Sequence, residues 1–199
     1  MLKDKVIVWE ENSQKGKRWV MSVDGIHCWI NEPSRPKWSQ GPRYYSHKYN
    51  KAGLDYELGI SLVDNRLLWI RGPFPAETND ITVLREEGLL AELKQQKQSA
   101  ICDKGYNGEP NHVSTCNLHD NAGAKLFKSR ALKGHENFNN LLKENNILDT
   151  RFRHNKTRFS DAFEARCVLA QYRIQGEISL YNILIEDVVD RYNEDRQEF

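Results

Sequence analysis

Residues 18–23 read RWVMSV and lead directly into Asp24-Gly25. Tryptophan and valine favour strands, and an aspartate followed by a glycine is a frequent turn signal. We therefore predict a strand that ends in a turn at Asp24. A second short apolar run, Ser99–Cys102, stops in the same way at Asp103-Lys104-Gly105 and is predicted to be a buried strand. If the two strands are neighbours, their ends bring the carboxylates of Asp24 and Asp103 together.

The rest of the chain completes an α/β pattern. Two apolar runs flank residues 64–66 and predict a β-hairpin. Leucines recur with helical spacing over residues 79–97, with Asn79 or Asp80 as the N-cap. The other predicted elements are helices near 129–145 and 159–174 and loops at 31–43 and 104–123. Strands followed by a helix, a strand and more helices are typical of an α/β domain with a mixed sheet.

The length and composition are those of one globular domain. The chain has 199 residues, of which 39% are hydrophobic and 29% charged, so wholesale disorder is excluded. We predict a domain at residues 1–175 and an acidic helical tail at 176–199, where seven acids face two arginines. No apolar run reaches the length of a membrane span, and the four cysteines are widely spaced, which indicates reduced thiols in an intracellular protein.

The charges are balanced overall but unevenly distributed. There are 29 basic and 28 acidic side chains, yet residues 125–158 hold nine basic residues against three acidic ones. Aromatic side chains are interleaved with this basic stretch, which suits a groove that follows a nucleic-acid backbone. A solvated surface explains the same pattern equally simply. The candidate phosphate contacts are Lys104, Arg130, Lys133, Lys143, Arg151 and Arg153.

Glu136 lies inside the helix predicted at 129–145. At about 100° per residue, Glu136, Asn140 and Lys143 share one face of that helix. Such a face can present a carboxylate to a metal ion and an ammonium group to a phosphate. An ordinary solvated helix face is the simpler explanation of these residues taken alone.

Five motifs follow one another along the chain. They are VDGIH at 23–27, YYS at 44–46, GPFP at 72–75 with NDITVLR at 79–85, CDKGY at 102–106, and HENFN at 135–139 with Lys143. Over about residues 20–175 the chain therefore resembles the DDE superfamily endonuclease domain of PIF/Harbinger-type, IS5-related transposases. Each motif alone is weak, whereas five in this order are specific.

The resemblance implies a fold, a site and a reaction. The fold is a ribonuclease H-like mixed sheet flanked by helices, and the catalytic, metal-binding acids are Asp24, Asp103 and Glu136. Two divalent ions, Mg²⁺ or Mn²⁺, would lie between these acids, and the substrate would be a DNA phosphodiester that is cleaved or transferred. Asp80 also matches a recurrent acid of the family, but its position before the leucine-rich segment favours a helix N-cap.

The resemblance also raises alternatives. Transposases of this type carry a helical DNA-recognition region ahead of the catalytic domain, whereas 23 residues precede Asp24 here. The chain is then a fragment, a truncated copy, or a protein that needs a separate DNA-binding partner. A domesticated, inactive module that binds DNA or a protein is the rival function, and an enzyme acting on RNA is a third. We expect a nuclear location in a eukaryotic host and no membrane partner, with the oligomeric state left open.

Overall fold

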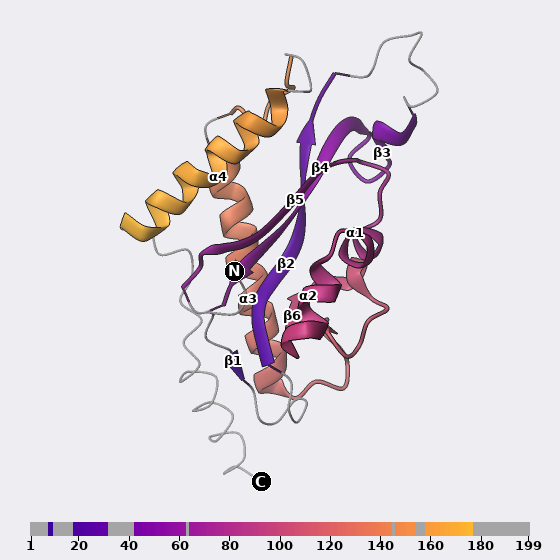
Figure 1. Ribbon diagram of the computed structural model, residues 1–199, viewed down its shortest axis with the longest axis vertical. Helices are drawn as coiled ribbons and strands as arrows, with labels where there is room; N and C mark the ends of the chain where they lie inside the picture. Colours follow the sequence, from indigo (N-terminus) through magenta and orange to yellow (C-terminus); the bar gives the residue numbers. More distant parts are fainter. Residues whose placement is uncertain are drawn as a thin grey trace.

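The described strands form one mixed sheet. The computed structural model describes residues 8–9, 18–31, 42–62, 64–144, 146–153 and 158–176 (Figure 1). The sheet has the order β3-β4-β2-β6-β7, with β1 also paired to β2 and β5 to β4. The strands are β1 (Val8–Trp9), β2 (Arg18–Trp29), β3 (Tyr45–Ser46), β4 (Lys51–Ser61), β5 (Leu67–Pro75), β6 (Ser99–Cys102) and β7 (Val113–Ser114). The pairs β2–β6 and β6–β7 are parallel and the other pairs are antiparallel, so the predicted mixed sheet is confirmed.

Strand β2 continues through Asp24, so the turn predicted there is wrong. It pairs with β4 without interruption from Met21↔Ser61 to Trp29↔Gly53. Nine consecutive cross-strand pairs outweigh the local turn preference of an Asp-Gly dipeptide, because sheet pairing depends on neighbours more than on intrinsic propensity. Pairing of β2 with β6 ends earlier, at Val23↔Cys102. Beyond that pair, no described strand covers this edge of β2 as far as Trp29.

The predicted hairpin and the predicted buried strand are both confirmed. Strands β4 and β5 are antiparallel neighbours joined across residues 62–66. Strand β6 is buried along its whole length and ends at Cys102. The segment after it, predicted as a loop to residue 123, instead contains the short 3-10 helix η3 (Lys104–Tyr106), strand β7 and the start of the next long helix.

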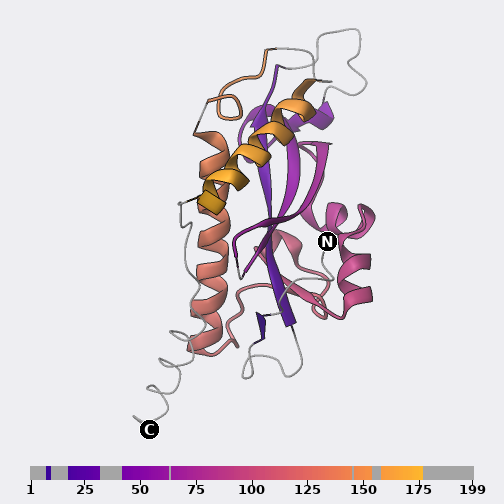
Figure 2. The ribbon, with the colours of Figure 1, turned by 60° about the vertical axis from the view of Figure 1, so that its left-hand side comes forward.

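Helices cover both faces of the sheet. Figure 2 shows α3 (Ala122–Lys143) and α4 (Phe159–Gly176) on one side and α1 (Asp80–Glu86) and α2 (Leu89–Gln96) on the other. Two apolar clusters correspond to these layers. One joins Phe138 and Phe163 to β2 and β4, and the other joins Leu84 and Leu93 to β2 and β6. The sheet therefore lies between two helical layers.

The helix boundaries differ from those predicted in two places. The single helix predicted from residue 79 or 80 to about 97 is broken at Gly88, whose φ of +99° is left-handed and easy only for glycine. Helix α3 begins at Ala122 rather than near 129, because the Asn121 side chain accepts a hydrogen bond from the Ala124 N–H at 2.7 Å. Helix α4 agrees with the prediction to within two residues, whereas the predicted tail beyond Gly176 lies outside the described residues.

The structure bears on two expectations, one about membrane-spanning segments and one about the cysteines. No helix in the described ranges is both long enough and apolar enough to span a membrane. The four cysteines, Cys28, Cys102, Cys116 and Cys167, are free thiols.

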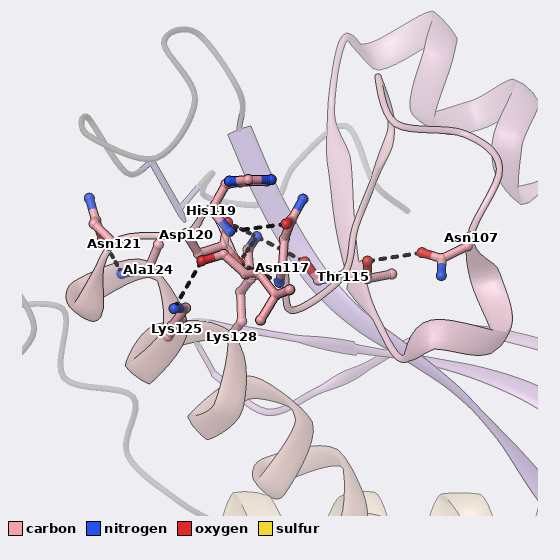
Figure 3. A network of polar contacts seen from close by, with 10 residues as sticks. Asn107, Thr115, Asn117, His119, Asp120, Asn121, Ala124, Lys125 and Lys128 are labelled. Carbon is pink, nitrogen blue, oxygen red and sulfur yellow. Dashed lines mark hydrogen bonds and ion pairs between the residues drawn. The ribbon is translucent and has the colours of Figure 1, made fainter.

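A buried ion pair fixes the loop before α3. The Lys128 ammonium lies 2.8 Å from both carboxylate oxygens of Asp120 and donates to the Thr115 carbonyl at 3.0 Å (Figure 3). The side chains of Lys128 and Asp120 are 1% and 6% exposed. The ammonium also lies 5.5 Å from the centre of the Trp19 ring. Through these contacts α3 holds residues 115–120 against the sheet.

Glu57 carries a pH-dependent part of the stability. Burial in β4 raises its pKa from 4.5 to about 7, partly offset by a hydrogen bond from the Trp69 indole at 2.9 Å. A raised native pKa means that the native state binds the proton more tightly, so this contribution is complete below about pH 4.5 and is lost as the pH rises through 7. We expect Glu57→Gln to stabilise the protein at pH 8 by about 3 kcal/mol.

Urea unfolding of wild type and Glu57→Gln at pH 5 and pH 8 measures this effect. The difference between the two proteins should grow with pH. An equal difference at both values would show that Glu57 does not titrate in this range.

Candidate metal-binding and catalytic site

Asp24 occupies the middle of β2 at the edge that β6 leaves uncovered. One carboxylate oxygen accepts a hydrogen bond from the Gly25 N–H at 2.8 Å, and the other accepts from the Asn139 amide at 3.4 Å. Burial raises the pKa of Asp24 to about 6; the Gly25 hydrogen bond lowers it, and the charges of Asp103 and Asp80 raise it further. The carboxylate is therefore held in place by β2 and α3, and it lies close to other negative charges.

Asp103 follows β6 and turns into η3. Its side chain caps η3 by accepting from the Gly105 N–H at 2.8 Å. Because β6 runs parallel to β2 and pairs with it up to Cys102, Asp103 emerges next to Asp24. Both residues line one cavity of about 310 Å³. The structure thus brings together the two acids whose proximity the strand ends predict.

Asp80 is a third carboxylate in this cavity, and sequence reasoning misplaced it. It is the first residue of α1 rather than its cap; Asn79 occupies the N-cap position, without a side-chain capping bond. A Cβ added to Gly105 would lie 2.5 Å from one Asp80 oxygen and 3.0 Å from an Asp103 oxygen, and one added to Gly25 would lie 3.4 Å from the other Asp80 oxygen. Two glycines therefore leave room for this carboxylate. Burial, followed by the charge of Asp103, raises the pKa of Asp80.

The donor chemistry of the cavity fits a hard divalent cation. Carboxylate oxygens are the ligands that Mg²⁺ and Mn²⁺ prefer, and a cation would relieve the mutual repulsion of Asp24, Asp80 and Asp103. Within the described ranges, no three His, Cys, Asp or Glu side chains converge into a group that could hold a metal ion. Mg²⁺ commonly uses one or two carboxylates together with water and substrate phosphate, so two adjacent acids suit it.

Lys48 supplies positive charge to the same cavity, and no sequence signal had singled it out as a site residue. Partial burial lowers the pKa of Lys48, but Tyr49 and the carboxylates of Asp24 and Asp103 outweigh that effect and raise it. Lys48 lines the cavity together with Ser46, the last residue of the short strand β3, and Tyr49, which follows that strand. The pairing of β3 with β4, which in turn pairs with β2, brings this segment toward the cavity.

Glu136 is not among the residues that line the cavity. Its side chain is 60% exposed and forms an ion pair with Lys133 at 2.8 Å. It lies less than one turn before Asn139, the residue of α3 that contacts Asp24. The metal-binding role implied by the resemblance therefore stays a prediction for Glu136.

The six candidate phosphate contacts lie outside the cavity as well. Lys104 is exposed in η3, directly after Asp103. The Arg151 side chain lies over the Trp29 ring, with its guanidinium carbon 4.6 Å from the ring centre. The Lys51 ammonium lies 4.2 Å from the centre of the same ring. The remaining four are distributed along α3 and the segment after it: Arg130, Lys133, Lys143 and Arg153.

Comparisons with known proteins identify the family. The sequence model of the DDE superfamily endonuclease family matches residues 23–171, about three quarters of the 199-residue chain. No curated protein matches the chain. The matched region begins just before Asp24 and includes both Asp103 and Glu136. The chain belongs to the DDE superfamily endonuclease family.

Proposed function

We propose that this chain is the catalytic domain of a transposase-derived, metal-dependent DNA endonuclease of the PIF/Harbinger, IS5-related type, with a ribonuclease H-like fold. The observation that carries the proposal is the meeting of Asp24 and Asp103 in one cavity at the end of β6. The mixed sheet with helices on both faces agrees with such a fold. The family match supports nuclease chemistry.

The residues of the chain prepare the cavity for a phosphodiester. Asp24 and Asp103 present oxygens whose orientation is fixed by hydrogen bonds from the Gly25 and Gly105 N–H groups. Lys48 lines the same cavity, where its positive charge would attract a phosphate. When bound by Asp24, Asp103 and Glu136, two Mg²⁺ or Mn²⁺ ions would stabilise charge on the attacking and departing oxygens. Asn139 keeps the Asp24 carboxylate turned toward α3.

Manganese binding tests the proposal without requiring activity. A ligand at 100 times its dissociation constant stabilises the native state by about 2.7 kcal/mol, which corresponds to about 5–10 °C for a chain of this size. We expect Mn²⁺ to raise the melting temperature of the wild type by this amount and to leave Asp24→Asn unshifted.

Asp161→Asn is the matched control, because Asp161 is an exposed acid on α4. It should respond to Mn²⁺ as the wild type does. A wild type that is indifferent to both Mn²⁺ and Mg²⁺ would support the rival function, an inactive module that binds DNA or a protein.

We also propose that Lys104 and the basic residues of α3 and the segment after it bind DNA through its phosphates. Each phosphate contact that is lost should flatten the plot of log affinity against log salt by about one unit. We therefore expect Lys143→Ala and Arg151→Ala each to reduce this slope. The reduction should be the same on DNA duplexes of unrelated sequence. Fluorescence anisotropy at several salt concentrations measures it.

Lys94→Ala serves as the control for charge removal, since Lys94 is exposed on α2. Slopes that fall equally in all three variants would contradict a groove beside α3. Such backbone contacts carry no base readout, so we propose that site-specific action requires a separate DNA-binding partner. A selected sequence preferred more than about a thousandfold over random duplex would contradict that proposal.

A further inference from the structure

His27 is held rigidly in the wall of the cavity that contains Asp24 and Asp103. Its ring stacks on Tyr49, with 4.6 Å between the ring centres and 23° between the planes. On β4, Gly53 leaves the space that the ring needs, because a Cβ there would lie 2.0 Å from the His27 Cε1. Only 8% of the His27 side chain is exposed. A glycine beneath the ring and an aromatic stack thus fix its orientation.

Asp55 determines which nitrogen of His27 carries the proton. The Nδ1 atom lies 2.6 Å from an Asp55 carboxylate oxygen. A carboxylate only accepts, so Nδ1 donates, and in the neutral ring Nε2 is left as an acceptor. In the described part of the chain Nε2 is buried and has no hydrogen-bond partner. An unpaired buried acceptor is costly, and none of the described residues supplies the missing donor.

The chemistry of Nε2 limits what that donor can be. Phosphate oxygens and carboxylates are acceptors and cannot pair with an unprotonated nitrogen. A hydroxyl group can, and a hydroxyl is also the group that attacks a phosphodiester.

We propose that His27 Nε2 accepts a hydrogen bond from the attacking hydroxyl and orients it in the cavity, with Asp55 as the positioning residue. The inference rests on the proposed nuclease function. The hydroxyl belongs to water in hydrolysis and to a DNA 3′ end in strand transfer.

Variant kinetics test the inference where the wild type cleaves DNA. His27→Phe keeps a ring between Tyr49 and Gly53 but removes both nitrogens. We expect kcat to fall about a hundredfold with KM changed less than threefold, since orientation of the nucleophile is lost while substrate binding is kept. Asp55→Asn should lower kcat at least tenfold, because it no longer favours the required tautomer. His119→Phe, at an exposed position outside the cavity, should keep parental kinetics.

Separate nicking and strand-transfer assays distinguish the two sources of the hydroxyl. A loss of nicking alone assigns water, and a loss of strand transfer assigns the 3′ end as well. Parental kcat for His27→Phe in both assays would overturn the inference. Unchanged melting temperatures for His27→Phe and Asp55→Asn would exclude an indirect effect through unfolding.

Imidazole nitrogen NMR tests the inference without catalysis. In ¹⁵N-labelled protein, the neutral His27 ring should show a protonated Nδ1 and an unprotonated Nε2. A short oligonucleotide with a free 3′-hydroxyl, added with Ca²⁺, should shift the Nε2 resonance; one ending in a 3′-deoxynucleotide should shift it less if the donor is the 3′ end. A protonated Nε2, or no shift with either oligonucleotide, would overturn the inference. If the wild type never cleaves DNA, the proposed function fails and this measurement alone decides the role of His27.

Discussion

Asp24→Asn is expected to lower the rate of Mg²⁺- or Mn²⁺-dependent DNA nicking by at least about a thousandfold. The substitution keeps the size of the side chain and removes the charge that would face a divalent ion, in a buried position where that charge has the largest effect. Asp103→Asn should lose as much. Residues that act as one unit are not additive, so the double variant should be no worse than either single variant. Single-turnover nicking of supercoiled DNA measures these rates.

The same assay decides which residue is the third acid of the site, Glu136 or Asp80. The family resemblance predicts that Glu136→Gln loses activity to the same extent, whereas in the structure it is Asp80 that shares the cavity with Asp24 and Asp103. Parental activity in Glu136→Gln together with a full loss in Asp80→Asn would contradict the prediction for Glu136. Asp161→Asn should nick DNA at the parental rate.

Lys128→Met is expected to destabilise the protein by about 3–5 kcal/mol, the usual cost of removing one partner of a buried ion pair. The methionine fills a similar volume, but Asp120 keeps a nearly buried charge without its cation, and the Thr115 carbonyl loses its donor. The melting temperature should fall by roughly 10 °C. Urea unfolding at pH 7 gives the free energy directly.

Two further variants separate the ion pair from the general effect of changing α3. Adding Asp120→Asn to Lys128→Met removes the unpaired charge and should recover part of the loss. Lys125→Ala, which removes an exposed hydrogen bond to the Leu118 carbonyl, should cost less than about 1 kcal/mol. A cost below 1 kcal/mol for Lys128→Met would show that the pair contributes little.

Much of the fold could be predicted because its signals are local. The hairpin of β4 and β5 follows from two apolar runs around a turn, and β6 follows from a short apolar run before Asp103. The prediction failed where pairing with a strand distant in the sequence determines how far a strand extends. Asp24-Gly25 has the composition of a turn, yet β4 pairs with it on one side and extends β2 to Trp29.

The site divides in the same way. The sequence predicts the proximity of Asp24 and Asp103 from a shared strand end, although β2 in fact runs on to Trp29. The two acids lie close because β2 and β6 are parallel neighbours whose pairing stops at Val23↔Cys102, one residue before each acid. His27 and Asp55 are 28 residues apart and meet only through the β2–β4 register. Asp80 and Lys48 reach the cavity from a helix start and a short edge segment. The family resemblance does single out Asp80, although its place at a helix start favours a cap, whereas no pattern around Lys48 indicates a place in the cavity.

Because β2 is unbroken from Asp24 to Trp29, it fixes the distance between these two residues. Five residues at ~3.4 Å each separate these two positions by about 17 Å. His27 lies on β2 between Asp24 and Trp29. A one-residue insertion or deletion within this interval would change the spacing and turn every following side chain to the opposite face, except where a β-bulge absorbs the extra residue.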